Sequence, residues 1–296
     1  MLSSMSRTCP SNLIFYCTDI RALPAPSIKP SATEMSRGVL TQRNLQKCLE
    51  ALHHDGPLDR LNERMLKDTA VLAAMGDNGP PVERDTFDPV MFLNPLATNV
   101  TSAFLGGQPT LTFLSGNVAM PDLVGDGQPV HSDADFAHPN IPFACVVNVG
   151  LVDISPQNGS TELWLGTHTG SGLHVQEGLH GERASGRIRS ELLQERTKIS
   201  PPFQPTIAKG SLVIRDLRLW HAGRPNRTSD PRIMLASIHM APWYRHRMAI
   251  RLPIALRSFI EPKLKAQSLG LAADWVERVN PLDVKFGNAY DFSQVD

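Results

Sequence analysis

Residues 143–165 read FACVVNVGLVDISPQNGSTELWL, and this stretch decides which fold we expect. It opens with a valine-rich run over 143–153 and closes with a second short run over 161–165. Asn158-Gly159 lies between the two runs and is a strong hairpin signal. Two strands joined by a tight turn predict antiparallel β-structure here.

The sequence on either side has a similar texture. Further strands are predicted over 110–115, 212–215 and 233–240, separated by segments rich in Gly, Pro and Asn. A polar insertion over 172–196 is expected to form a loop or a helix over one face. Strands that follow one another without intervening helices favour an antiparallel sandwich or a small barrel.

Residues 40–72, before these strands, carry the clearest helical spacing of apolar residues. A first helix is expected to end at Asp55-Gly56-Pro57, and a second to run over 59–74. The sequence therefore predicts a mainly β fold with flanking helices.

Composition excludes several classes of partner. The chain has 296 residues, with 29 Lys plus Arg against 29 Asp plus Glu, and so lacks the basic excess of nucleic-acid binders. Its apolar stretches are too short and too interrupted to span a bilayer. Its four cysteines show no C-x-x-C spacing, which favours reduced thiols over a zinc ribbon or a disulfide scaffold. We expect a small-molecule substrate, with no nucleic acid and no membrane as partner.

The chain is expected to form a mobile N-terminal arm over 1–34 and a single domain over 35–296. The arm is rich in Ser, Thr and Pro, which would also suit a transit peptide, but Asp19 and the prolines disfavour the helix that such a peptide needs. Within the domain, a barrel core is expected over about 100–245 and a C-terminal extension over 246–296. The last four residues, SQVD, match no peroxisomal or ER-retention signal, so the expected location is cytoplasmic.

The stretch QPVHSDADF, residues 128–136, carries the first candidate chemistry. In an extended segment, side chains at positions i and i+2 point to the same side, so His131 and Asp133 could converge on one point. His221 follows 88 residues beyond Asp133 and could complete a triad of two histidines and one carboxylate. Such a triad leaves positions open on Fe(II) for a chelating co-substrate and oxygen. Asp135 competes with Asp133, but it stands four residues from His131.

Arg232 begins an apolar strand, where its guanidinium could point into a cavity. A buried guanidinium needs a carboxylate partner, and the strand itself contains none, so a ligand carboxylate fits. The alternative is a surface arginine paired with Asp230 or another acid. Arg224 and Arg227 compete for the same role, but both lie in a turn and are expected to face solvent.

The order His-x-Asp, His, Arg, with NGSTELWLGTH at 158–168 between the first two elements, resembles the phytanoyl-CoA dioxygenase family. The resemblance covers roughly residues 40–245 and is closest to short fungal and bacterial members that act in natural-product biosynthesis. It implies an Fe(II)- and 2-oxoglutarate-dependent oxygenase that uses O2. It also implies a double-stranded β-helix, the jelly-roll or cupin-like barrel, and a homodimer as a family expectation.

The resemblance assigns a role to each matched residue. It makes His131, Asp133 and His221 the iron ligands, and it makes Arg232 the residue that clamps the distal carboxylate of 2-oxoglutarate. Two further positions, Gln128 and Thr161, match residues that touch the co-substrate. His168 is expected to be structural and not a ligand.

The expected function is therefore oxidation of a small organic substrate, by hydroxylation, desaturation, epoxidation or rearrangement, in secondary-metabolite biosynthesis. One alternative is an acyl hydroxylase of the phytanoyl-CoA type. A second is a cupin-like protein that binds a ligand without turnover. A third is a zinc hydrolase that uses the same triad. A hydrolase has no use for a 2-oxoglutarate clamp, so Arg232 separates it from the oxygenase.

Overall fold

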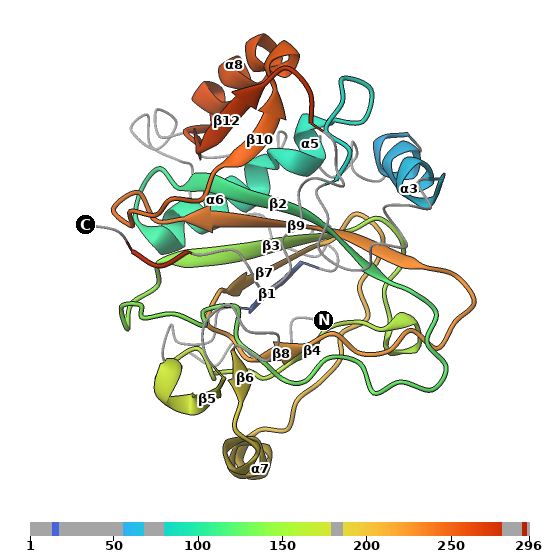
Figure 1. Cartoon of the computed structure of the whole chain (residues 1–296), viewed down its shortest axis with the longest axis vertical. Helices are drawn as coiled ribbons and strands as arrows, with labels where there is room; N and C mark the ends of the chain where they lie inside the picture. Colours follow the sequence, from blue (N-terminus) through green and yellow to red (C-terminus); the bar gives the residue numbers. More distant parts are fainter. Residues whose placement is uncertain (1–13, 18–55, 68–79, 179–185, 280–291, 295–296) are drawn as a thin grey trace, which may run out of the picture.

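The computed structural model describes residues 14–17, 56–67, 80–178, 186–279 and 292–294. Its largest element is a six-stranded sheet with the order β1-β7-β3-β9-β2-β11 (Figure 1). The bounds of these strands, in sheet order, are Ile14–Cys17, Leu212–Asp216, Ala144–Gly150, Arg232–Met240, Thr110–Ala119 and Gly270–Leu271. All neighbouring pairs are antiparallel except β2 and β11.

A second, smaller sheet is built from short strands. It contains β4 (Glu162–Leu163), β5 (Gln176–Glu177), β6 (Arg187–Ile188) and β8 (His221–Ala222). β4 pairs with β8 and β5 pairs with β6, and His131 joins the two pairs because it bridges to both Arg187 and His221. Figure 1 shows these strands near α7 (Ser190–Ile199), at the end opposite the parallel pair β10 (Ile250–Pro253) and β12 (Ala273–Val276).

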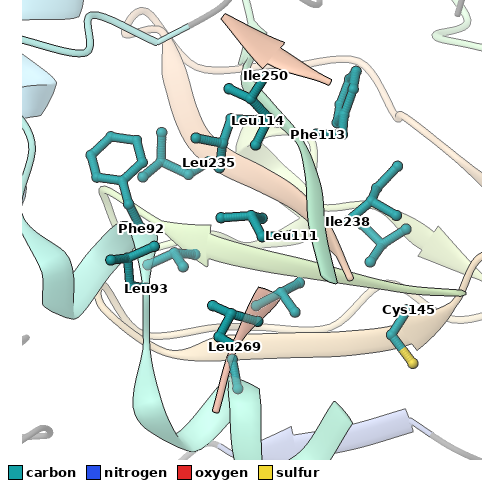
Figure 2. Close-up of a cluster of buried hydrophobic side chains, with 14 of the residues drawn as sticks. Phe92, Leu93, Leu111, Phe113, Leu114, Cys145, Leu235, Ile238, Ile250 and Leu269 are labelled. Atoms are coloured by element: carbon teal, nitrogen blue, oxygen red, sulfur yellow. The ribbon is translucent and has the colours of Figure 1, made fainter. Parts of the chain in front are cut away.

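The middle strands of the large sheet are covered on both faces. Every residue of β7 is buried, and so is every residue of β3 except the partly buried Asn148. Strands buried on both faces lose the alternation of apolar and polar residues. Figure 2 shows part of the resulting core, where side chains of Leu111 and Leu235 from the sheet gather with Phe92 and Leu93.

Helix α6 (Pro95–Leu105) packs against the large sheet and has clear sequence determinants. Asn94 caps its start, accepting hydrogen bonds from the backbone N–H of Leu96 and Ala97, and Pro95 follows at the first helical position. Gly106 ends it in the left-handed region at φ 82°. The other helices of the described residues are α3 (Pro57–Lys67), α5 (Pro89–Phe92), α7 and α8 (Arg257–Gln267).

These elements confirm the mainly β class with flanking helices. Each of the five predicted strands is present, as is a helix over all of the described part of 59–74; the first predicted helix lies outside the described residues. Residues 14–17, inside the expected arm, form β1, and the rest of 1–34 is not described. Among the described strands no pairing joins the edges of the two sheets, so the closed jelly-roll barrel stays a prediction.

The predicted hairpin at Asn158-Gly159 is wrong. The turn is present, as a 3-10 turn over Pro156–Asn158 followed by Gly159 at φ 80°. However, the strands on either side belong to different sheets, because β3 pairs with β7 and β9 whereas β4 pairs with β8. The turn thus carries the chain from one sheet to the other.

None of the described helices is long and apolar enough to cross a membrane.

The contact between α6 and β9 includes a buried histidine with a predictable pH response. Thr101 Oγ1 lies 2.8 Å from His239 Nδ1, and burial lowers the pKa of His239 to about 4. The unfolded chain therefore takes up this proton near pH 6.5, before the folded chain does. Above pH 6.5 His239 is neutral in both states, so its protonation does not lower the free energy of unfolding. As pH falls from 6.5 to 4, we expect its protonation in the unfolded chain to lower the free energy of unfolding by roughly 3 kcal/mol.

The measurement is urea unfolding across this pH range, with His239→Gln as the comparison because glutamine stays neutral throughout. The variant should show a flatter dependence of its unfolding free energy on pH. Equal slopes for the two proteins would show that His239 does not carry this effect.

Candidate metal centre

The backbone brings His131 and His221 together. Each of the two residues donates its N–H to the other's carbonyl oxygen at 2.9 Å, an antiparallel bridge between segments 90 positions apart. Residues directly opposite in such a pair have side chains on the same face. Their ring centroids accordingly lie 4.3 Å apart.

Asp133 joins them from the same side, as its i+2 relation to His131 predicts. Its Oδ1 lies 3.7 Å from His131 Nε2 and 3.5 Å from His221 Nε2. Within the described residues these three side chains form the one group whose ligand atoms, all within 4.8 Å of one another, could hold a metal ion. Asp135, which the sequence offered as a competitor, is not part of this group, and neither is His168, which was expected to be structural.

The opposite face of the small sheet anchors the triad. Residues adjacent to the two histidines point away from them into a separate buried cluster, formed by Val130, Trp164, Val175, Ile188, Trp220 and Ala222. Leu192 and Leu193 of α7 pack against this cluster. The candidate ligands thus lie on a short sheet whose other face is buried, which limits their movement.

Hydrogen bonds orient both imidazole rings. His131 Nδ1 lies 2.9 Å from the carbonyl oxygen of Pro129, and His221 Nδ1 lies 3.0 Å from that of Leu219. A carbonyl oxygen only accepts, so each Nδ1 carries a proton, and in the neutral imidazole Nε2 then presents its lone pair. This is how metal-binding histidines are held in proteins, with one nitrogen on the metal and the other on a backbone or carboxylate acceptor.

A residue that the sequence analysis did not select completes the site. Arg215, in β7 of the large sheet, donates from Nη2 to Asp133 Oδ2 at 2.6 Å, and both side chains are largely buried. Burial alone would raise the pKa of Asp133, but Arg215 together with His221 and His131 holds it well below its usual range. Burial, and then the charge of Arg215, lowers the pKa of His221 well below its ordinary value. At neutral pH the site therefore presents a carboxylate and a neutral His221 imidazole.

Arg232 is buried at the start of β9, as expected, but its partners are neutral. Nη1 donates to Asn117 Oδ1 at 2.8 Å, and Nη2 donates to the carbonyl oxygen of Gly159 at 2.9 Å. Among the described residues its Nε is buried with no hydrogen-bond partner, and no carboxylate forms an ion pair with it. The guanidinium thus keeps donors for a carboxylate that the described chain does not supply.

Of the two positions expected to touch the co-substrate, Gln128 is exposed and pairs with Gly223, two residues after His221. The Oε1 atom of Gln128 accepts from the backbone N–H of Gly223 at 3.0 Å, and the backbone N–H of Gln128 donates to the Gly223 carbonyl oxygen, which extends the pairing between the two histidine segments. Thr161 is partly buried, two residues after Gly159. A contact of either residue with a co-substrate stays a prediction.

The competing arginines have other partners. Arg224 makes a bidentate ion pair with Glu162 at 2.6 to 2.8 Å, and Glu162 also accepts from the indole N–H of Trp164. Arg227 is exposed and donates to the backbone carbonyls of Asp122 and Gly125. Neither guanidinium is free to clamp a co-substrate.

Comparison with known proteins gives a family. The phytanoyl-CoA dioxygenase family matches residues 37–234, about two thirds of the chain, and the match includes the triad and Arg232. A curated relative, dioxygenase af480 of Aspergillus fumigatus, is 26% identical over 190 residues, which are 62% of this chain and 55% of the relative. The chain thus spans about half the length of this relative.

Two solved structures illustrate the structural likeness. AviO1 from Streptomyces viridochromogenes is 16% identical, with a TM-score of 0.43 over 69% of this chain and 87% of its own. The iron-bound structure of EctD from S. alaskensis is also 16% identical, with a TM-score of 0.45 over 74% of this chain and 79% of its own.

Proposed function

The chain belongs to the phytanoyl-CoA dioxygenase family, and from this premise we propose that it is an Fe(II)- and 2-oxoglutarate-dependent oxygenase of a small organic molecule. His131, Asp133 and His221 would hold the iron, and Arg232 would bind the distal carboxylate of 2-oxoglutarate. The observation that carries the proposal is the convergence of two Nε2 atoms and one carboxylate oxygen from segments far apart in sequence.

The donor set fits Fe(II). Two imidazoles and one carboxylate on one side of a metal form the arrangement of non-haem iron oxygenases, which leaves positions for further ligands. The ionised Asp133 and the neutral His221 mean that neither of these two ligands must lose a proton before binding near neutral pH. With 2-oxoglutarate and O2, bound Fe(II) supplies oxidation of a substrate C–H bond, coupled to oxidative decarboxylation of 2-oxoglutarate to succinate.

The chain's own residues would bind and orient. Arg232, buried and unpaired with any described carboxylate, would fix the far end of 2-oxoglutarate, while Gln128 and Thr161 would contact it nearer the metal. The apolar cluster behind the small sheet would keep the ligands rigid while substrate enters from the other side.

Membership of the family also leads us to propose details of the fold, role, location and oligomeric state of the chain. A jelly-roll arrangement of the two sheets, a role in secondary-metabolite biosynthesis, action in the cytoplasm and a homodimeric state are parts of the same proposal. Hydroxylation is the simplest outcome, and desaturation, epoxidation or rearrangement would use the same residues. The acyl hydroxylase alternative differs only in its substrate, so assays with free acids, acyl-CoA esters and neutral small molecules would separate it.

The proposal is tested by anaerobic titration of the metal-free protein with Fe(II) and 2-oxoglutarate. We expect a weak visible charge-transfer band from the Fe(II) chelate in the wild-type protein and its loss in His221→Ala, because two remaining ligands bind the metal poorly. The band should also require both components, since neither Fe(II) nor 2-oxoglutarate produces it alone.

The matched control is His168→Ala. This histidine is also buried near a turn of the small sheet but lies outside the triad, so its variant should keep the band if it remains folded. A folded wild-type protein that forms no band would overturn the oxygenase proposal and favour the zinc hydrolase or the cupin-like binding protein.

A further inference from the structure

Arg215 stands out among the buried charged residues because its one hydrogen bond goes to a candidate metal ligand. Nη2 donates to Asp133 Oδ2, while Nε and Nη1 are buried with no hydrogen-bond partner among the described residues. Burying polar nitrogens without acceptors is costly, and an apolar side chain within a buried strand would avoid the cost. Strand packing therefore does not explain an arginine at this position.

The other buried arginine of this region shows what a structural ion pair looks like. Arg218 binds both oxygens of Asp216, two residues away, through Nε and Nη2 at 2.8 Å each. Arg215 instead reaches across to another segment and uses a single nitrogen on a single oxygen. This difference indicates that the contact with Arg215 serves to hold the Asp133 carboxylate in one position.

The contact divides the two oxygens of Asp133 between two tasks. Oδ2 is held by Arg215 at 2.6 Å, whereas Oδ1 faces His131 Nε2 and His221 Nε2. A carboxylate with both oxygens free can bind a cation through one or both. Two-oxygen binding would occupy a coordination position that a chelating co-substrate needs.

Arg215 is well placed to impose this restriction. It lies in an inner strand of the large sheet, β7, which pairs at Arg215 with Val146 of β3 and with Ile14 of the edge strand β1. Its backbone is thus fixed by strands on both sides, independently of the segment that carries Asp133. The large sheet supplies a rigid reference for a ligand on the small sheet.

We propose that Arg215 is a positioning residue that restricts Asp133 to one-oxygen ligation and so keeps the co-substrate position on the metal open. This inference rests on the proposed function, because it needs a metal at the triad. Arg215 itself touches neither metal nor co-substrate.

The test uses Co(II) in place of Fe(II), because its visible absorption reports the number and geometry of its ligands and it is stable in air. Co(II) and then 2-oxoglutarate are titrated into wild-type protein and Arg215→Met, recording the spectrum and the Kd for 2-oxoglutarate by calorimetry. We expect the variant to bind Co(II) with a changed spectrum and to bind 2-oxoglutarate about 10- to 100-fold more weakly.

Arg224→Met is the matched control. It removes a guanidinium that also pairs with a carboxylate, three residues after His221, but its partner Glu162 lies outside the triad. Spectrum and Kd should match those of the wild type. Arg215→Lys, which keeps the charge and a donor, should recover part of the affinity, and it decides the question if the methionine variant does not fold.

Each outcome has one meaning. A changed Co(II) spectrum together with weaker 2-oxoglutarate binding supports the positioning role. A wild-type spectrum with weaker binding would mean that Arg215 acts on the co-substrate directly, and wild-type values for both would mean that it has no role at the site; either result overturns the inference. A wild-type protein that binds no Co(II) at the triad overturns the proposed function instead.

Discussion

Replacing Asp133 by alanine is expected to destabilise the metal-free protein by roughly 3–5 kcal/mol, a large effect for a residue expected to act in catalysis. The reason is the charge that remains. Arg215 is only 7% exposed, and Asp133 supplies its one described hydrogen bond and ion pair. Without the carboxylate, a guanidinium stays buried with no counter-charge, which costs more than the pair itself contributes. The measurement is urea unfolding of the metal-free protein at pH 7.

The double variant Asp133→Ala, Arg215→Met provides the control for this mechanism. Removing both charges also removes the unpaired charge, so the double variant should be more stable than Asp133→Ala alone. The two substitutions are in contact and should be strongly non-additive. If the double variant is no more stable than the single one, the loss in Asp133→Ala has another origin, such as the cavity that it leaves.

Glu261→Ala supplies a matched comparison on the surface. Glu261 accepts from Arg257 at the same 2.6 Å distance, one turn apart on α8, but both side chains are about half exposed. Exposed ion pairs contribute little because water already solvates both charges. The contrast between the two variants therefore isolates burial as the cause.

The sequence predicted the parts of this site that depend on local structure, such as the alternation of side chains in an extended segment. His131 and Asp133 share a side because they are two residues apart in an extended segment. Valine-rich runs in the sequence predict strands of the sheets around them. His221 and Arg232 were paired with them by the order of the motif and by the family resemblance. The structure places His221 on the bridge to His131 and Arg232 at the start of β9.

The sequence could not predict the relations between the two sheets. Asn158-Gly159 has the composition of a hairpin turn, but whether its two strands pair depends on their partners elsewhere in the chain, here β7, β8 and β9. Arg215 was missed for the same reason, since its partner lies 82 positions away on the other sheet. A charged residue inside the apolar run Leu212-Val-Ile-Arg-Asp was the available signal, and it pointed to burial but not to a partner.

A second large effect is expected from Arg232, on the affinity for 2-oxoglutarate. Replacing it by methionine is expected to raise the Kd for 2-oxoglutarate in the Co(II)-loaded protein by roughly two to three orders of magnitude. Arg232 is 2% exposed, and its guanidinium is already oriented by Asn117 and the Gly159 carbonyl, so it need not be ordered when a carboxylate arrives. A charge-assisted hydrogen bond made in such a buried place is much stronger than one made in water.

The same substitution should leave the metal site intact, because Arg232 contacts no member of the triad in the described structure. Co(II) should therefore bind Arg232→Met with the wild-type affinity and spectrum, which distinguishes this variant from Arg215→Met. Arg232→Lys should fall between the two proteins, since lysine keeps the charge but cannot offer two parallel donors. Arg232→Met that binds 2-oxoglutarate as tightly as the wild type would exclude the clamp. A hydrolytic activity supported by Zn(II) and unaffected by this substitution would instead identify the triad as a hydrolase centre, because hydrolysis requires no second carboxylate at Arg232.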